Sequence, residues 1–134
     1  MTDSTPPSTN ACPFCRPDKA RVILETDAVV AIRDAYPITD GHALVIPRQH
    51  VWSIFDLNEV EQDALWRAVA QVRAILFRKF APDAFTVGVN DGAAAGQTIG
   101  HAHIHVIPRR NGDVPDPRGG VRNIIPDRAR YWEK

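Results

Sequence analysis

The amino-acid sequence predicts an α+β domain built on an antiparallel sheet. Short apolar segments, bounded by turn-forming Pro, Gly, Asn and Asp, occur on both sides of one long amphipathic segment. Strands joined by short turns pair antiparallel, whereas a parallel sheet needs a crossover between neighbouring strands. With 134 residues, the chain is long enough for one domain with one hydrophobic core.

The segment before the long amphipathic stretch is expected to contribute three strands. Residues 1–11 are rich in Ser, Thr, Pro and Asn and are predicted to be a disordered tail. Apolar segments at 20–26 and 28–34, separated by the turn around Thr26 and Asp27, predict two short strands. A third strand is predicted at 42–47, where Pro47 ends it.

Residues 59–80 predict the one long helix. Apolar side chains repeat there at helical spacing, which gives one face for the core: Leu65, Val69, Val72 and Leu76. Asn58, followed three residues later by Glu61, predicts a capping box at its start. Pro82 marks its end.

The second half predicts two further strands and a long tail. A strand at 84–90 is followed by a loop of small residues at 91–100 and by the histidine-bearing strand. Pro and Gly interrupt the remainder, which is expected to be extended along the surface. We therefore divide the chain into a domain at 12–110 and a C-terminal extension at 111–134, which packs on the domain or on a partner subunit.

The charge balance argues against binding to nucleic acid or to an anionic membrane through overall charge. Sixteen basic residues balance sixteen acidic ones, so no net field attracts nucleic acid or an anionic membrane. The N-terminal segment "MTDSTPPSTN" lacks the basic and apolar regions of a secretory signal, and no apolar run has membrane-spanning length. A cytoplasmic location is expected.

The stretch "GHAHIHVIP", residues 100–108, places histidines at every second position: His101, His103 and His105. In a strand this spacing puts all three imidazoles on one face, opposite Ala102 and Ile104. Three interpretations are open: ligands of a metal, a catalytic nucleophile with its helpers, or a solvated polar face.

The two cysteines, in "CPFC" at 12–15, are also open to three interpretations. They form a metal-binding turn, a redox pair, or a turn without chemistry. A redox pair of the thioredoxin type needs a preceding strand and a following helix. Here a polar tail precedes the motif and a predicted strand follows it, which disfavours the redox interpretation.

The loop before the histidines has the composition of an anion site. Gly92, Gly96 and Gly100 allow the backbone to approach a ligand, and Gln97 and Thr98 offer side-chain donors. Backbone amides in such a loop can bind a phosphate without any net charge. Glycines are also ordinary in turns, so the loop gains meaning only from the histidines beside it.

Three segments together resemble the histidine triad (HIT) family: "HAHIHVI" at 101–107, "GHALVIPRQH" at 41–50 and "NDGAAAGQT" at 90–98. The resemblance extends from Cys12 to Arg109. It implies a HIT-like fold, with a five-stranded antiparallel sheet and one long helix, and a homodimer. It also implies attack on the α-phosphate of a nucleotide, with no nucleic acid and no membrane as partner.

The resemblance also assigns roles to individual residues. His103 matches the nucleophile that forms a nucleotidyl-histidine, and His105, His42 and Gln97 match the other catalytic positions. The expected substrate contacts are the ribose for Asp34, the base for Ile32, and the phosphate for Asn90, Gln97, Thr98 and His105. Without the resemblance, Asp34 is equally a turn former, Ile32 a core residue and His42 a satisfied buried histidine.

Family members with an N-terminal Cys-x-x-Cys often bind a structural zinc ion. The resemblance implies that its ligands here are Cys12, Cys15, His50 and His101. Two thiolates and two imidazoles form a closed tetrahedral site, typical of zinc that holds a structure together. No organic cofactor is expected.

Two branches of the family differ in their substrates, and short segments of this sequence indicate which branch it resembles. The segments "AGQT" and "IPRRNGD" resemble the dinucleoside polyphosphate hydrolases, of the fragile histidine triad type, with diadenosine tetraphosphate as the expected substrate. The ending "YWEK" lacks the tail of the purine nucleoside phosphoramidases, which remain the alternative. Arg109 and Arg110 are expected either to contact further phosphates or to be solvated. A nucleotide-binding regulatory module and a catalytic metal held by all three triad histidines are the other hypotheses.

Overall fold

The computed structural model describes residues 11–133. Residues 1–10 of the predicted tail lie outside this range. The five strands are β1 (Val22–Glu25), β2 (Val29–Arg33), β3 (Ala43–Pro47), β4 (Ala84–Gly88) and β5 (Ile104–Arg109). The α-helices are α1 (Glu59–Phe80) and α2 (Pro126–Ala129).

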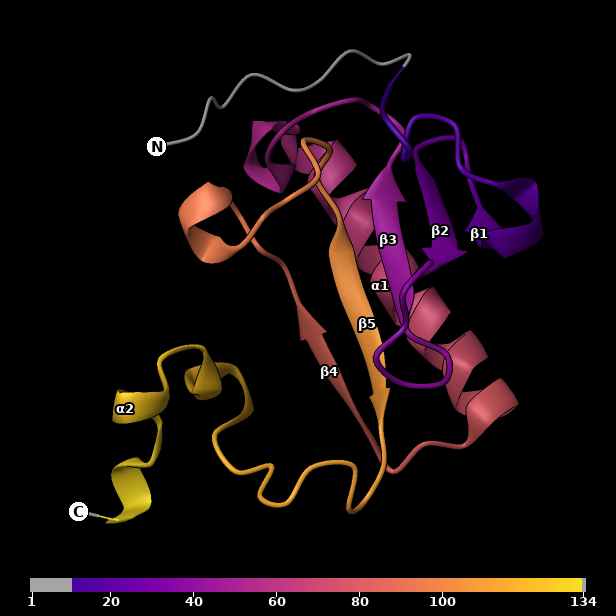
Figure 1. Ribbon diagram of the computed structural model, residues 1–134. Helices are drawn as coiled ribbons and strands as arrows, with labels where there is room; N and C mark the ends of the chain where they lie inside the picture. The colour runs from indigo at the N-terminus through magenta and orange to yellow at the C-terminus, as the bar shows by residue number, and fades with distance from the viewer. Residues whose placement is uncertain (1–10, 134) are drawn as a thin grey trace.

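The strands form one antiparallel sheet in the order β1-β2-β3-β5-β4 (Figure 1). The helix α1 connects β3 to β4, so the chain leaves the middle of the sheet and returns at its edge. The strand β5 then inserts between β3 and β4. The predicted fold class, an α+β domain with a five-stranded antiparallel sheet and one long helix, is confirmed.

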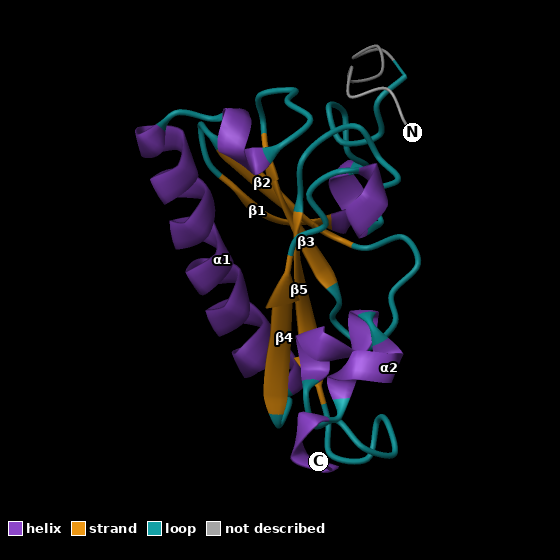
Figure 2. Cartoon of the chain, turned by 90° about the vertical axis from the view of Figure 1, so that its left-hand side faces the viewer, coloured by secondary structure: helices purple, strands orange, loops and turns teal. Residues whose placement is uncertain are grey.

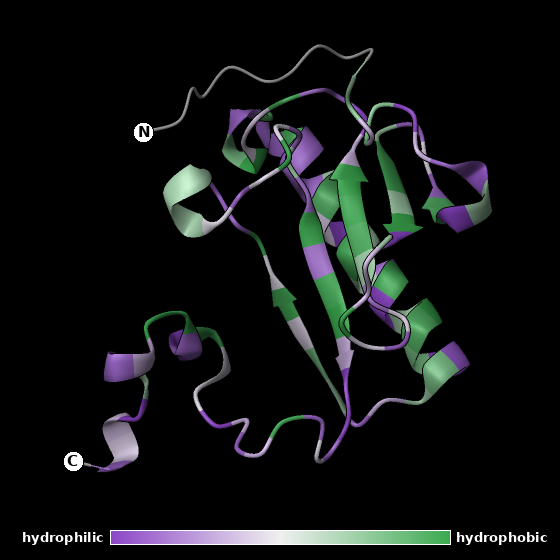
Figure 3. Cartoon of the chain, in the orientation of Figure 1, coloured by the Kyte–Doolittle hydropathy of each residue, from purple (hydrophilic) through white to green (hydrophobic). Residues whose placement is uncertain are grey.

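The helix α1 covers one face of the sheet (Figure 2). Its buried side chains Leu65, Ala68, Val69, Val72 and Leu76 pack against alternate residues of the central strands. The central strands and the inner side of α1 are accordingly the most hydrophobic part of the chain (Figure 3). Burial of this face is the main stabilising term of the domain.

The opposite face of the sheet is covered by irregular segments. Over β2 and β3, the turn at 12–15 packs Cys12 and Phe14 against a second apolar cluster, which contains Val30, Ile32, Leu44 and Ile46. Over β4 and β5 lies the C-terminal extension (Figure 2). The middle of this face, between the two coverings, holds the histidines.

Gly41 allows the loop before β3 to pack closely against the end of α1. Its φ of +93° lies in the region that favours glycine, and an added Cβ would lie 2.8 Å from a ring carbon of Phe80. This close contact helps to position the backbone of the next residue, His42.

No helix within residues 11–133 is both long and apolar enough to cross a membrane.

The C-terminal extension differs from the extended conformation expected from its Pro and Gly content. It forms short helical turns, at Gly120–Ile124 and in α2, that bond to one another. Arg122 donates to the carbonyls of Ala129 and Arg128, at 3.0 and 2.7 Å, and its guanidinium lies over the ring of Tyr131. The Arg122 side chain thus satisfies carbonyls at the C-terminal end of α2, where the helix provides no backbone donor.

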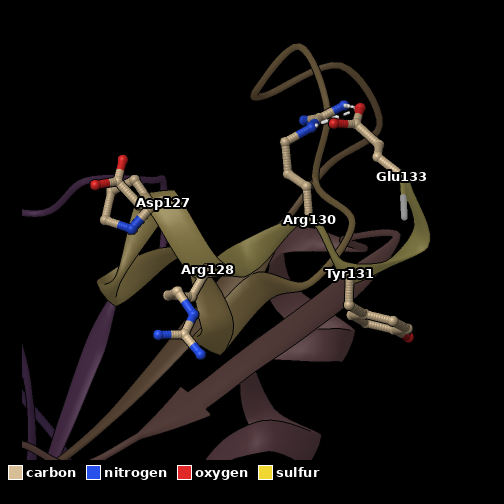
Figure 4. Close-up of a pocket in the computed structure, with 6 residues that line it drawn as sticks. Asp127, Arg128, Arg130, Tyr131 and Glu133 are labelled. Atoms are coloured by element: carbon tan, nitrogen blue, oxygen red, sulfur yellow. Dashed lines mark hydrogen bonds and ion pairs between the residues drawn. The ribbon is translucent and has the colours of Figure 1, made fainter.

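The end of the extension has a shallow hollow of about 300 Å³ (Figure 4). It is lined mainly by charged side chains, and the guanidinium of Arg130 lies 2.7 Å from the carboxylate of Glu133. Arg130 also lies 3.2 Å from Asp116, which ties the end of the extension back to its beginning. These exposed ion pairs shape the extension and contribute little stability each.

The capping box of α1 generates a prediction. Asn58 Oδ1 accepts from the Glu61 amide and Glu61 Oε1 accepts from the Asn58 amide, both at 2.8 Å. Asn58→Ala should lower the free energy of unfolding by about 1 kcal/mol, because it leaves an amide of the first turn without a partner. Urea unfolding measures this, with Asn111→Ala in an exposed loop as the control. Equal stability of the two variants would contradict the prediction.

Candidate functional site

The alternating pattern of the histidine segment is reproduced, but the regular strand begins later than expected. β5 starts at Ile104, so only His105 belongs to the ladder, paired between Leu44 of β3 and Gly88 of β4. The preceding residues stay extended, held by the bond from the Ala102 amide to the Val51 carbonyl at 2.8 Å. Ala102, Ile104 and Val106 pack toward α1, and the three imidazoles contact groups on the other face of the sheet.

His101 joins the two cysteines and His50 in one cluster. Its Nδ1 atom lies 3.3 Å from Cys12 Sγ, 3.5 Å from Cys15 Sγ and 3.1 Å from His50 Nδ1. Cys15 Sγ lies 3.0 Å from His50 Nδ1, and the four donor atoms lie within 4.8 Å of one another. Two sulfurs and two imidazole nitrogens at such spacing are placed to bind one metal ion.

The second nitrogen of His101 supports this assignment. Its Nε2 lies 2.7 Å from the carbonyl oxygen of Pro47, which only accepts, so the ring proton resides on Nε2. The lone pair of Nδ1 therefore points at the cysteines and is free for a cation. Burial, together with the neighbouring Cys12, raises the pKa of the Cys15 thiol to about 11, so a thiolate at Cys15 needs a positive charge beside it.

The surroundings of the cysteines do not match a redox pair. A short helical turn at Lys19–Arg21 and then β1 follow the turn, so Cys12 does not begin a helix. The redox interpretation therefore lacks the local structure that it requires.

A different backbone carbonyl orients His103. Its Nδ1 lies 2.8 Å from the carbonyl oxygen of His101 and must donate to it, which leaves the lone pair on Nε2. The ring is 9% exposed and packs edge-on against Phe14, with centroids 5.0 Å apart. Burial, as the largest cause, lowers the pKa of His103 and keeps the ring neutral at pH 7. A neutral imidazole with a free Nε2 is a nucleophile.

His105 is oriented through His42. The Ile38 amide donates to His42 Nδ1 at 3.2 Å, so the proton of His42 resides on Nε2. That Nε2 lies 2.9 Å from His105 Nδ1 and donates to it, so the proton of His105 resides on Nε2. Burial, followed by the nearby His103 and His42, lowers the pKa of His105 to about 4. His105 is thus a neutral hydrogen-bond donor.

Asp34 acts as a turn former, which is one of the two interpretations that the sequence left open. Its Oδ1 accepts from the Tyr36 amide at 2.8 Å and shapes the turn after β2. Its Oδ2 lies 3.4 Å from His42 Nε2. Because burial lowers the pKa of His42 and its Nδ1 accepts from an amide, this contact joins a carboxylate to a neutral ring and is not an ion pair.

These side chains meet in a cavity of about 540 Å³. Five of the predicted catalytic and substrate-binding residues line it: Asp34, Asn90, Thr98, His103 and His105. Two of these, Asn90 and His105, also line a neighbouring cavity. Phe14, Pro13 and Tyr36 also line it and were not predicted from the sequence. The sequence did contain a signal for Phe14, because it lies between two candidate metal ligands, Cys12 and Cys15, which place its ring at the cavity wall.

Two predicted contacts are not supported by the geometry. Gln97 Nε2 donates to the carbonyls of Trp52 and Ile99, at 2.8 and 2.9 Å, and its Oε1 accepts from the Gly92 amide. Its polar atoms therefore brace the loop instead of facing the cavity. Ile32 is fully buried in the cluster beneath Phe14 and does not line the cavity. It is a core residue that supports the wall from behind.

The geometry divides the triad between two tasks. His101 faces the cysteines, whereas His103 and His105 line the cavity with their rings 5.2 Å apart. A catalytic metal held by all three histidines is therefore disfavoured. Asp34, His42 and His105 form a second cluster of possible ligands, but His42 Nε2 and His105 Nδ1 already share a hydrogen bond.

Comparisons with known proteins agree with this site. Residues 16–112 match the HIT domain. Over 100 residues the chain is 36% identical to a bis(5'-nucleosyl)-tetraphosphatase (asymmetrical) of Schizosaccharomyces pombe, covering 75% of this chain and 55% of that protein. Over 95 residues it is 33% identical to a bis(5'-adenosyl)-triphosphatase of Dictyostelium discoideum, covering 71% and 64%. The chain thus spans less than two thirds of the length of either enzyme.

A solved structure of the same fold contains zinc. The crystal structure of a Zn-bound histidine triad family protein from Mycobacterium smegmatis matches with a TM-score of 0.67 at 37% identity, covering 81% of this chain and 86% of that one. The match of the HIT domain covers most of the chain, including every histidine described above. By its fold and by its sequence, the chain belongs to the HIT domain family.

Proposed function

We propose that this protein hydrolyses nucleotides at the α-phosphate through a covalent nucleotidyl intermediate on His103. The observation that carries the proposal is the bond from His103 Nδ1 to the His101 carbonyl, which leaves a neutral Nε2 lone pair at a nucleotide-sized cavity. The tetraphosphatase and triphosphatase among its relatives support phosphoanhydride hydrolysis.

The reaction consists of two displacements at phosphorus. In the first, Nε2 of His103 attacks the α-phosphorus, a nitrogen–phosphorus bond forms, and the bond to the bridging oxygen breaks. In the second, water attacks the same phosphorus, the nitrogen–phosphorus bond breaks, and a nucleoside monophosphate leaves. The Nε2–H of His105, together with Thr98 and Asn90, donates to the phosphoryl oxygens as charge develops. Asp34 accepts from the ribose hydroxyls, and Phe14 packs against the nucleoside.

The protonation state of His105 favours polyphosphate over phosphoramidate substrates. His105 is neutral, and its Nδ1 lone pair already accepts from His42, so it supplies a hydrogen bond more readily than a proton. A departing phosphate is a stable anion and needs no proton, whereas a departing amine does. We therefore propose dinucleoside polyphosphates, such as diadenosine tetraphosphate, as the substrates.

We also propose that Cys12, Cys15, His50 and His101 bind a structural Zn²⁺. The spacing of the donor atoms, the free Nδ1 of His101 and the zinc-bound relative support this ion. When bound, the metal supplies a crosslink and no chemistry at phosphorus. Because Phe14 lies between two of the ligands, the crosslink would also fix the wall of the nucleotide cavity.

A homodimer and a cytoplasmic location stay predictions from the sequence. The position of β4 at the sheet edge is compatible with pairing to a second copy. The division into a tail, a domain at 12–110 and an extension likewise stays a proposal.

The first prediction of this proposal concerns the intermediate. Wild-type protein mixed with diadenosine tetraphosphate and quenched within one turnover should carry an acid-labile adenylyl group, detected by intact-protein mass spectrometry. His103→Gly should carry none, and its hydrolysis rate should fall on the order of 10³-fold or more. Added imidazole should restore part of the rate, because it fills the space of the missing ring. Undiminished hydrolysis by His103→Gly would refute the mechanism.

The second prediction concerns the metal. Purified protein should contain one zinc ion per chain by elemental analysis, and Cys15→Ser or His50→Ala should lose it. Chelation should lower the melting temperature and weaken the binding of AMP measured by calorimetry, since Phe14 loses its anchor. His105→Asn is the matched control, because it removes a histidine outside the ligand set and should keep the metal. Retention of zinc by both ligand variants would show that the ion binds elsewhere.

The third prediction concerns pH. The pKa of His105 is lowered from the ordinary 6.5 to about 4, so the ring stays neutral at pH 5–6, where a free imidazole is protonated. Since the unfolded chain binds the proton first, stability also falls as the pH decreases below 6.5. The acid limb of kcat/KM should therefore lie well below 6.5, and the His105 ring should titrate there by NMR. A ring that titrates at 6.5 or above would contradict the hydrogen-bond chain through His42.

A further inference from the structure

A second cavity, of about 550 Å³, adjoins the nucleotide cavity on the far side of His105. His105 and Asn90 line both cavities. A group transferred to His103 lies against His105, so a leaving group directed away from the nucleoside enters this second cavity. The two cavities thus adjoin at His105 and Asn90, beside the position expected for the scissile bond.

The floor of the second cavity is the open face of β4 and β5. Thr86 and Gly88 of β4 lie in register with Ile107 and His105 of β5. Gly88 has no side chain, and a Cβ added there would meet nothing within 4 Å. The glycine therefore leaves the floor flat directly beside the catalytic histidine.

The walls of the second cavity are mainly apolar. The β2–β3 loop contributes Ile38, and the C-terminal extension contributes Val114, Val121 and Ile124 from the other side. Val121 is 65% exposed and Ile124 is 77% exposed. A ligand that covers these exposed apolar side chains removes them from water, which lowers the free energy and favours binding.

Arg109, the one cation that residues 11–133 place in the lining of this cavity, is already paired. Its Nε and Nη2 donate to the two carboxylate oxygens of Asp113, at 2.6 and 2.8 Å, and its Nη1 donates to Thr86 at 3.1 Å. This bidentate bond lowers the pKa of Asp113 well below its usual range. The expectation that Arg109 contacts further phosphates is therefore not supported. The cavity selects for an uncharged, flat group instead of additional phosphate.

Contacts within the C-terminal extension fix the segment that contributes Val121 and Ile124 to the cavity wall. Arg118 and Arg130 lie over the ring of Trp132, at 4.7 and 5.6 Å from its centroid, and both bond to Asp116. These contacts lie within the extension and close it on itself at both ends. The residues between them, which include Val121 and Ile124, are thereby presented to the sheet.

We propose that the second cavity is a leaving-group subsite that binds an aromatic group, the nucleobase of the departing nucleotide. The inference rests on the proposed function, since it needs transfer to His103. The first cavity then determines which nucleoside is transferred to His103. The C-terminal extension determines which leaving nucleotide is preferred. Donors with a second base react faster than donors with the same phosphates and no second base.

The experiment compares two donors that give the same adenylyl-His103. Diadenosine triphosphate releases ADP and ATP releases pyrophosphate, so the donors differ in the terminal adenosine and in the additional negative charge of the free γ-phosphate. The γ-methyl ester of ATP lacks both that charge and the second base, and it should react as slowly as ATP. In the zinc-loaded wild-type protein, kcat/KM for diadenosine triphosphate should exceed that for ATP by about tenfold or more. The γ-phenyl ester of ATP distinguishes a general aromatic subsite from one that needs a nucleobase.

The variants test the wall. Val121→Asn and Ile124→Asn should each reduce the preference several-fold, because they make the wall polar. They add no charge that would repel the departing pyrophosphate, so the rate with ATP should stay unchanged. Val60→Asn is the matched control, because Val60 is 76% exposed at the start of α1, on the other face of the sheet. It should keep the wild-type preference.

The outcomes separate the inference from the function on which it rests. Labelling of His103 by ATP with no preference for diadenosine triphosphate would overturn the subsite alone. The subsite is also overturned if Val121→Asn keeps the preference, or if it only changes the sedimentation of the protein, which would assign this face to a second copy. Failure of both donors to label wild-type His103 would overturn the proposed function and the subsite together.

Discussion

The site depends on hydrogen bonds between backbone groups and single histidine nitrogens. A neutral imidazole has one donor and one acceptor, so a partner at one nitrogen decides what the other can do. The Pro47 carbonyl directs the lone pair of His101 to the cysteines, and the His101 carbonyl directs that of His103 to the cavity. The Ile38 amide acts through His42 and makes His105 a donor. Three chemically identical side chains thereby acquire three different properties.

These backbone groups are positioned by the packing of the whole domain. The sheet holds Pro47 at the end of β3, and α1 buries the alternate residues between the histidines. Gly41 allows the loop that carries Ile38 and His42 to approach Phe80 at the end of the helix. Apolar burial on one face of the sheet therefore maintains polar geometry on the other, where the hydrogen bonds alone are too weak to order these segments.

Two irregular segments cover the face of the sheet opposite α1. Each of them lines one of the two cavities beside the catalytic histidines. The cysteine turn brings Phe14 to the nucleoside side, and the C-terminal extension brings Val121 to the leaving-group side. Neither covering belongs to the sheet. In our proposals, a metal holds one covering and internal ion pairs shape the other.

The five strands and the long helix could be predicted from the sequence, and the family resemblance supplied the four metal-binding candidates. The helical turns of the C-terminal extension were not predicted. Strict alternation and helical periodicity are local properties, and the resemblance to a family supplied the order in which distant segments meet. Which atom of each side chain is used, in contrast, depends on the tertiary structure. Gln97 has its donors taken by two carbonyls, Arg109 has its charge compensated by Asp113, and Ile32 lies behind the wall. Those outcomes depend on partners distant in sequence or on burial, and composition and spacing contain no information about either.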